Sequence, residues 1–351
     1  MFFKYVALHY VKHMLIILLG LSGLFTGLDY LINSSSLTSF NIKILYAFLK
    51  WQKALNLLYP LAIIFGAIWT YISFVKNHTL SSFYALGVTR KELLKPFLVV
   101  SISTYLLFLM LNFTSFSTAN DTANRVQENQ YGVSKTEDLF FKYDDNFVYI
   151  NTLIPQRYKI ENLIIFKMKN DEVIETFTAK EAWYNIYEWV AFDVIKKSKV
   201  TDKNGNQYLK VEKIVRLHTL KDYQPKILKS IYDGKELTLD AAISAKRLLT
   251  NQGLSTEALR ADIYGKIVLP LFSIALIIIL ILSFPFHARY MNITATTMKA
   301  LGGTLFTWGI LFAMQRIGEN GTIMPELAII LPVVLLFLYA LYTFKESGRQ
   351  I

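Results

Sequence analysis

The sequence predicts a membrane protein in which two groups of three transmembrane helices flank one all-β domain. Three observations lead to this fold class. Only 18% of the 351 residues are charged and 53% are hydrophobic, whereas a soluble domain is usually about 25% charged. The apolar residues gather in separate runs of the length that crosses a bilayer, about 20 residues. Between the third and fourth runs the pattern changes to alternating apolar and polar residues, which is typical of strands.

The first group of predicted spans comprises residues 13–32, 54–75 and 97–117. The second and third of these contain no charged side chain, and the first contains only Asp29, near its far end. The first run is longer than the apolar core of a signal peptide, and no small-residue cleavage site follows it. We therefore expect a retained membrane helix there.

The second group comprises residues 267–286, 293–315 and 327–344. The first and last runs of this group are uncharged. The middle run is the weakest of the six, because it holds Lys299 near its start and the pair Gly302-Gly303. The predicted domains are thus spans one to three in 1–117 and spans four to six in 263–351.

The positive charge flanks the apolar runs. Residues 120–262 carry 22 Lys+Arg and 21 Asp+Glu, so of the net charge of +11 about +10 belongs to the rest of the chain. A nucleic-acid-binding protein would instead concentrate its charge on a soluble basic face. With the N-terminus in the cytosol, ten basic residues fall on the inner side and four on the outer side, which favours cytosolic termini and an external β domain. The inner set is Lys4, Lys12, Lys76, Arg90, Lys91, Lys95, Arg289, Lys299, Lys345 and Arg349, and the outer set is Lys43, Lys50, Lys53 and Arg316.

The external domain is predicted at residues 118–237, with connecting helices at 238–262. The predicted strands are 146–150, 163–168, 173–179, 189–196 and 208–215. Turn residues separate them, and Asn204-Gly205 is a strong hairpin signal because both residues tolerate positive φ. Since no helix-length pattern lies between the strands, we expect an antiparallel sandwich or jellyroll. It is either a plain folded domain or an open sandwich that receives a ligand.

The connecting segment has helical spacing. Thr238 is suited to the N-cap of a first helix that Gly253 ends, and residues 255–257 open a second helix that continues into the fourth span.

The sequence lacks the common motifs of nucleotide-binding and catalytic sites. Neither a phosphate-binding G-x-x-x-x-G-K-[ST] motif nor a G-x-S-x-G nucleophile motif occurs, and the chain has no cysteine. His9 and His13 have zinc-like spacing but no third ligand nearby. We expect no metal, no cofactor and no catalytic residue, so the chain is not a self-contained enzyme.

Four charged residues near the outer surface are candidate lipid-binding residues: Asp29, Lys43, Arg125 and Arg316. A charged group at the membrane is costly and is a functional candidate by default. Cations above an apolar cavity suit the phosphates of an amphiphile. The alternative is that these are ordinary interfacial charges.

The inner loop between spans two and three is a candidate docking site near residues 79–91. Residues 82–86 are helix-compatible, Gly87 suits a left-handed C-cap, and Thr89 suits the next N-cap. We expect a short helix across the inner face, with Phe83, Tyr84 and Leu86 exposed to a soluble partner. The alternative is an amphipathic turn that rests on lipid. The candidate residues are Phe83, Tyr84, Ala85, Leu86, Gly87, Val88, Thr89 and Arg90.

Several of these segments resemble the LptF and LptG permeases of lipopolysaccharide export, over nearly the whole chain. Residues 85–90 (Ala-Leu-Gly-Val-Thr-Arg) resemble the family's coupling helix. Tyr131-Gly132, Leu139-Phe140-Phe141 and residues 146–150 resemble the opening of its external jellyroll. The fourth span is similar through Tyr264-x-Lys266-x3-Pro270-Leu271 and Ser283-Phe284-Pro285-Phe286. Leu58-Tyr59-Pro60-Leu61-Ala62 and Asp29-Tyr30-Leu31 lean towards LptG.

The resemblance implies a subunit of an ABC transporter in the bacterial inner membrane, with the β domain in the periplasm. Its implied partners are the paralogous permease, a dimer of the ATPase LptB, and LptC. Its implied cargo is lipopolysaccharide, which leaves the outer leaflet for a periplasmic bridge. The chain departs from the family at Thr79, where an acidic residue is common, and at Thr26, Ile32 and Asn33, where lysines are common. Lipid contacts would then fall to Lys43, Arg125 or Arg316.

Two other functions fit the topology less well. One is a different ABC permease, for lipoprotein release or of FtsX type, which would usually have four spans and its external domain after the first. The other is a membrane sensor or scaffold without transport. Loop mapping by cysteine labelling separates the first, and co-purification with an ATPase separates the second.

Overall fold

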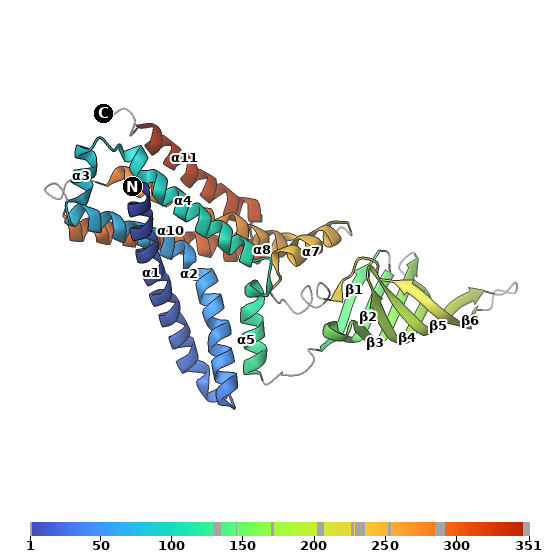
Figure 1. The fold of residues 1–351 in the computed structure, drawn as a ribbon. Coiled ribbons are helices and arrows are strands. Elements are labelled where there is room, and N and C mark those ends of the chain that lie inside the picture. The colour runs from blue at the N-terminus through green and yellow to red at the C-terminus, as the bar shows by residue number, and fades with distance from the viewer. Residues whose placement is uncertain are drawn as a thin grey trace. The chain divides into compact units, whose positions relative to one another are not determined.

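The computed structural model describes residues 2–128, 135–144, 146–169, 172–201, 207–225, 228, 236–251, 254–284 and 292–346. The chain forms two compact units (Figure 1). The helical unit consists of Met1–Gln127 and Glu257–Ile351, and the β unit is Glu128–Thr256. Predicted features outside the described residues are Tyr131-Gly132, the Asn204-Gly205 turn, Gly253, Pro285-Phe286, Arg289 and Arg349.

Five helical segments in the described part of the chain are long and apolar enough to cross a bilayer. They are Phe2–Ser36, Phe40–Lys76, Arg90–Leu111, Glu257–Ser283 and Glu326–Glu346. Their elements are α1 (Phe2–Asn33) with η1 (Ser34–Ser36), α2 (Phe40–Lys76), α4 (Arg90–Leu111), α8 (Glu257–Ile267) with η4 (Leu269–Leu271) and α9 (Phe272–Ser283), and η6 (Glu326–Ile330) with α11 (Leu331–Glu346). Each corresponds to one of the predicted spans.

The sixth predicted span corresponds to α10 (Ile293–Glu319), which is not among these five. Its 27 residues extend over about 40 Å, which is enough to cross a bilayer. However, its threonines and glycines, together with Lys299 near its start, make it less apolar than the others. Met298 and Phe306 expose about 70% of their surface, so α10 presents an apolar face. Six membrane crossings remain a prediction.

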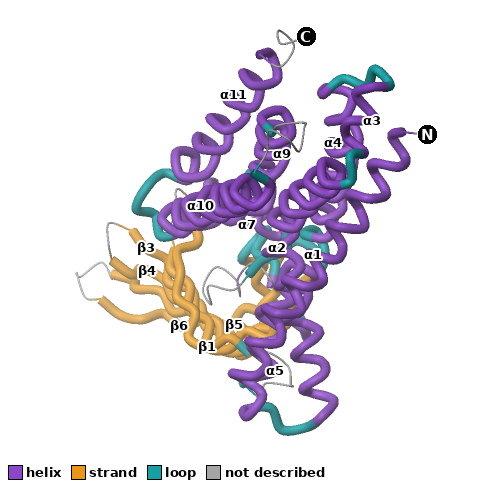
Figure 2. The backbone as a smooth tube through the Cα atoms, turned by 90° about the vertical axis from the view of Figure 1, so that its left-hand side faces the viewer, coloured by secondary structure: helices purple, strands orange, loops and turns teal. Residues whose placement is uncertain are grey.

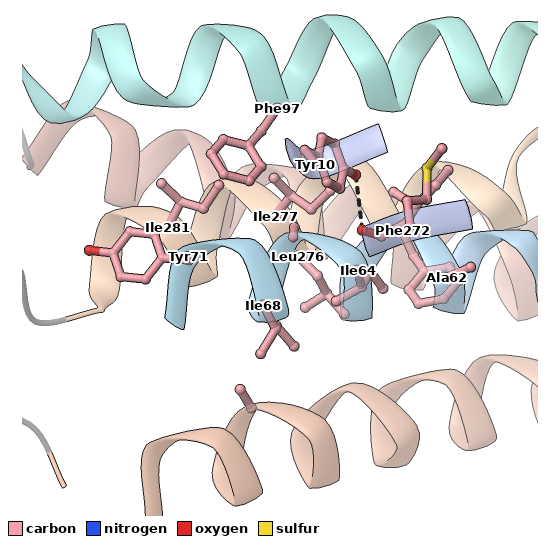
Figure 3. Packing of buried hydrophobic residues seen from close by; sticks show 14 of the residues in the cluster. Tyr10, Ala62, Ile64, Ile68, Tyr71, Phe97, Phe272, Leu276, Ile277 and Ile281 are labelled. Carbon is pink, nitrogen blue, oxygen red and sulfur yellow. Dashed lines mark hydrogen bonds between the residues drawn. The ribbon is translucent and has the colours of Figure 1, made fainter. Parts of the chain in front are cut away.

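The helix α2 forms the centre of the helical unit. In its most apolar window 78% of the residues are buried, against 17% in α1 and 22% in α11. The buried cluster around it joins residues of α1, α4 and α9 (Figure 3). Inside this cluster the Tyr10 hydroxyl donates to the Ile63 carbonyl oxygen at 2.9 Å and lies 2.8 Å from the Ser101 hydroxyl. The Tyr10 hydroxyl is therefore paired within the protein, as the bilayer interior requires.

A close approach between α1 and α2 depends on Gly66. A Cβ atom there would lie 2.7 Å from the Met14 Cα, which is backbone and cannot move aside cheaply. We predict that Gly66→Ala separates the two helices and lowers the free energy of unfolding by about 1–2 kcal/mol, the cost of modest overpacking. Thermal unfolding of the detergent-solubilised chain measures this. Gly20→Ala on α1 is the matched control, because no described atom lies within 4 Å of its added Cβ. Equal melting temperatures for the two variants would contradict the prediction.

The β unit contains one antiparallel sheet whose six strands follow one another in sequence order (Figure 1). Figure 2 colours its strands orange. The strands are β1 (Thr136–Tyr143), β2 (Asn146–Ile154), β3 (Lys159–Lys169), β4 (Glu172–Asn185), β5 (Glu188–Thr201) and β6 (Gln207–Thr219). The all-β prediction is confirmed, and the five predicted strands lie in β2 to β6. The described strands form a single meander, whereas a sandwich would have two facing sheets.

One face of this sheet carries the core of the β unit. Leu139, Val148, Ile150, Leu163 and Val194 are all buried there, and they follow the alternation of strands with one covered face. The segment after β6 covers part of this face through Leu220, Tyr223 and Leu228. The helix α7 (Leu239–Asn251) begins directly after Thr238, and its Leu248 packs against the same core.

Candidate functional site

The predicted inner loop is a short helix followed by a tight, defined turn. α3 (Thr79–Ala85) has Leu86 as its C-cap, and Gly87 has a φ of +83°. The Gly87 amide donates to the Tyr84 carbonyl at 3.0 Å, and the Val88 amide to the Phe83 carbonyl at 3.1 Å. This pair of bonds is the Schellman motif, in which the left-handed residue is normally glycine. The predicted C-cap at Gly87 is confirmed.

The next helix starts with a complete capping box. The Glu92 amide donates to the Thr89 hydroxyl at 3.2 Å, and the Thr89 amide donates to the Glu92 carboxylate at 2.9 Å. The predicted N-cap at Thr89 is therefore confirmed. With both helix ends capped, the connection between α3 and α4 has a fixed geometry.

The loop exposes fewer hydrophobic side chains than expected. Leu86 is 80% exposed, as predicted. Phe83 and Tyr84 are only partly exposed and pack against the helical core, so the expectation that they are exposed is wrong. Their role in binding a partner stays a prediction. The Phe83 ring stacks edge-on to Phe2 at 4.8 Å and to Phe74 at 5.9 Å. Burial raises the pKa of the Tyr84 hydroxyl.

Two basic residues tie the start of α4 to the second group of spans. The Arg90 guanidinium donates to the Leu282 carbonyl oxygen at 2.8 Å, near the end of α9. The Lys91 ammonium lies 4.7 Å from the ring centre of Phe344 in α11. The loop is thus connected to α9 and α11 as well as to its own neighbours α2 and α4. A displacement of the loop would reach both halves of the helical unit.

A pocket of about 400 Å³ lies beside this turn. Its walls combine apolar side chains with one acidic and one basic residue: Phe2, Phe3, Leu86, Gly87, Val88, Glu92 and Lys95. Leu86 projects beside the pocket. An exposed apolar side chain next to a pocket is typical of a surface that binds a protein partner.

At the other end of the helical unit, Asp29 belongs to a polar network centred on Lys50. Lys50 is only 6% exposed, and its ammonium lies 3.8 Å from the Asp29 carboxylate. The same ammonium donates to the side-chain oxygens of Asn120 at 3.1 Å and Asn124 at 3.0 Å. Asp29 also accepts a hydrogen bond from the Tyr46 hydroxyl at 2.5 Å. The network joins α1 and α2 to α5 (Ala119–Gln127), so Lys50 is a structural cation that the sequence had placed only as a loop charge.

The other predicted lipid-binding residues have different surroundings. Lys43 is partly exposed at the end of the first turn of α2. Arg125 lies on α5, which packs on α2, and donates to the Thr122 hydroxyl at 3.1 Å. Arg316 is paired with Glu319 on its own helix at 2.7 Å. Asp29 is thus engaged within the protein together with Lys50, and the lipid-binding role of all four stays a prediction.

Two helices have glycine positions that the described part of the chain does not cover. On α1, no described atom lies within 4 Å of a Cβ added at Gly20, Gly23 or Gly27. These positions share one helix face, and Gly23 and Gly27 form a G-x-x-x-G pair. The same openness holds at Gly302, Gly303 and Gly309 on α10. Small residues on an apolar helix let another helix approach closely in a membrane.

The described residues hold no cluster of three or more metal-ligating side chains. His13 instead lies 2.9 Å from the Thr70 hydroxyl and stacks on Trp69 at 5.5 Å. It therefore packs within the first group of helices.

Several membrane-length helices and a separate β unit define a multi-span membrane protein with a folded β domain. The sequence model of the lipopolysaccharide export system permease LptF/LptG family matches residues 4–346. The chain belongs to this family, and it is a multi-pass permease of the inner membrane that serves lipopolysaccharide export. Members of this family are transport subunits and not catalytic enzymes. No curated protein matches the chain.

Proposed function

We propose that this permease extracts lipopolysaccharide from the outer leaflet of the inner membrane and passes it to a periplasmic bridge, driven by a separate ATPase subunit. The observation that carries the proposal is the inner loop. It is capped at both ends, exposes Leu86 beside a pocket, and is linked through Arg90 and Lys91 to α9 and α11. Because the sequence has no phosphate-binding motif, the energy of ATP must come from an ATPase subunit that binds the permease. The loop offers a binding surface for that subunit.

In this proposal the ATPase, a dimer of LptB, binds the knob formed by Leu86 and the turn at Gly87. ATP binding moves α3, and the Arg90 and Lys91 contacts transmit the movement to the second group of spans. The cavity between the permeases then closes and expels the lipid towards the β units. The N- and C-termini lie in the cytosol and the β unit lies in the periplasm, as the charge distribution favours.

Lys43, Arg125 and Arg316 bind the lipid phosphates in this proposal. Lys43 and Arg125 lie on α2 and α5, which the Lys50 network holds together. Asp29 acts through that network by positioning Lys50. LptC and the bridge receive the lipid, and the chain itself carries no cofactor.

The second permease packs on the open glycine faces of α1 and α10. We predict that Gly27→Leu reduces the amount of paralogous permease that co-purifies with this chain severalfold, because a branched side chain prevents close helix approach. Affinity purification from co-expressing cells measures the ratio of the two chains. Leu338→Trp on α11 adds bulk at a residue that is 57% exposed but away from the glycines, and it should leave the ratio unchanged. If Leu338→Trp lowers the amount of co-purifying permease and Gly27→Leu does not, the interface lies elsewhere.

Purification of the native complex tests the partner assignment as a whole. We expect an ATPase dimer and a paralogous permease to co-purify, with bound lipopolysaccharide detectable by mass spectrometry. If the chain purifies without any ATPase after mild extraction, the proposal that a separate ATPase powers transport is contradicted.

A further inference from the structure

At one end of the β sheet, backbone hydrogen bonds join the connecting segments into one platform. The turn after β2, the β4–β5 hairpin and the segment after β6 meet there. The Tyr184 amide donates to the Tyr158 carbonyl at 2.9 Å, and the Asp222 amide donates to the Tyr187 carbonyl at 2.7 Å. The Tyr184 hydroxyl donates to the Ile186 carbonyl at 2.8 Å. Three separate segments are therefore held in one fixed arrangement.

This platform exposes large hydrophobic side chains. Ile186 is 71% exposed, Tyr187 68%, Tyr158 55% and Trp183 42%. The rings of Tyr158 and Tyr184 stack at 6.3 Å, which fixes the orientation of the exposed ring. We call Tyr158, Trp183, Ile186 and Tyr187 the aromatic tip. Single exposed hydrophobic residues are ordinary, but four of them at one end of a sheet, on a fixed frame, indicate an interaction surface.

Ile186 stands at a position that local physics disfavours. It is the first residue of the two-residue connection between β4 and β5, and its φ is +54°. Glycine is preferred there, and a β-branched residue with positive φ is strained. Both its backbone conformation and its exposure to water are unfavourable for an isoleucine. Such an outlier points towards a function rather than towards folding.

The aromatic tip lies at the end of the sheet through which the chain enters and leaves. Thr136, the first residue of β1, pairs with Leu153. Thr219, the last residue of β6, pairs with Trp189. Both pairs belong to the end that carries the β4–β5 hairpin, and only eight residues separate α5 from β1. Both connections to the helical unit therefore leave the sheet from the end that carries the aromatic tip.

The composition of the tip suits a lipid headgroup layer. Tyr and Trp favour the membrane–water interface, where the ring is buried and the polar atom stays in water. Two exposed basic residues, Arg157 and Lys221, lie next to the tip together with two acidic residues, Asp222 and Glu188. The tip therefore has balanced charge, and its Tyr and Trp side chains are what suit it to the headgroup layer.

We infer that the aromatic tip is an interfacial membrane anchor, with Ile186 and Tyr187 inserted among the headgroups of the bilayer that the helices span. The anchor orients the β unit over the membrane. The inference is independent of transport, because it requires a bilayer but no lipopolysaccharide, ATPase or second permease.

The chain has no cysteine, so single labels test the anchor directly. The full-length chain carries bimane at Ile186→Cys, or at Leu209→Cys as the control, and is reconstituted in vesicles of phosphatidylethanolamine and phosphatidylglycerol. Leu209 is 68% exposed and lies at the opposite end of the sheet. Nitroxide lipids labelled near the headgroup report contact with the bilayer, and iodide reports contact with water. We expect the ratio of lipid quenching to iodide quenching to be severalfold higher at position 186 than at position 209.

Equal ratios at the two positions would overturn the anchor. Protection of position 186 from both quenchers would also overturn it, since a protein surface would then cover the tip. A second variant checks the contribution of the side chain with the turn preserved. Asn tolerates positive φ, so Ile186→Asn keeps the hairpin, and it should lower the lipid quenching of a bimane at Tyr158→Cys. Lipid quenching at Tyr158 that is unaffected by Ile186→Asn would exclude Ile186 as the inserted residue.

Discussion

Lys50→Met is expected to release α5 from the helical unit and to accelerate hydrogen exchange of the α5 amides about 100-fold. The Lys50 ammonium is buried among the Asp29 carboxylate and the side-chain oxygens of Asn120 and Asn124. Methionine keeps the apolar stem but leaves these oxygens without a cation. Breaking a buried ion pair costs about 3–5 kcal/mol, and the lower end applies because Asp29 is 23% exposed. A cost of about 3 kcal/mol corresponds to about 100-fold in an opening equilibrium.

Asp29→Asn provides the control for this variant. Combined with Lys50→Met it removes the uncompensated charge, so the double variant should exchange more slowly than the sum of the single effects implies. Exchange in α4 should be unchanged in all three proteins. Unaltered exchange of α5 in Lys50→Met would show that the network does not hold this helix.

Gly87→Val is expected to lower the amount of lipid released per ATP hydrolysed about tenfold, with hydrolysis itself retained. The Schellman turn requires positive φ at this position, which costs about 1–2 kcal/mol for a residue with a side chain. A cost near 1.4 kcal/mol is about tenfold in an equilibrium. The variant therefore shifts the loop away from the conformation that carries Leu86 and the Arg90 contact. Parallel assays of phosphate and lipid release in reconstituted vesicles give the ratio.

Gly87→Asn separates turn geometry from added bulk. Asparagine adopts positive φ more readily than valine, so we expect a smaller loss of release per ATP. The spans should melt at the same temperature in both variants, because no described atom lies within 4 Å of an added Cβ at Gly87. Full release per ATP by Gly87→Val would remove this turn from the coupling path.

The sequence was sufficient to predict those features that depend only on residues close together in the chain. The cap at Thr89 and the left-handed turn at Gly87 follow from rules that span three or four residues. Five of the six spans follow from hydropathy in the same way. The inward packing of Phe83 could not be found like this, because its partners Phe2 and Phe74 come from other helices.

Lys50 was missed for the same reason. Its acceptors Asn120 and Asn124 lie about 70 residues further along the chain. Their four-residue spacing places both on one helix face, which is the signal that the sequence contained. Without the packing of α5 on α2, nothing in the sequence relates that face to Lys50.

In the β unit, alternation revealed five strands but not β1. There Leu139, Phe140 and Phe141 are consecutive, and Phe140 is 55% exposed and stacks on Phe147 on the open face. The meander order was also accessible in principle. The connections β1–β2, β3–β4 and β4–β5 each comprise two residues, and loops this short join antiparallel neighbours.

The most direct test of the account measures transfer of lipopolysaccharide from vesicles that contain this chain, its paralogue, the ATPase and LptC to a soluble acceptor. The account predicts transfer only when the ATPase and ATP are both present, and no ATP hydrolysis by this chain alone. Hydrolysis by the purified chain, or transfer that proceeds without the ATPase, would contradict it.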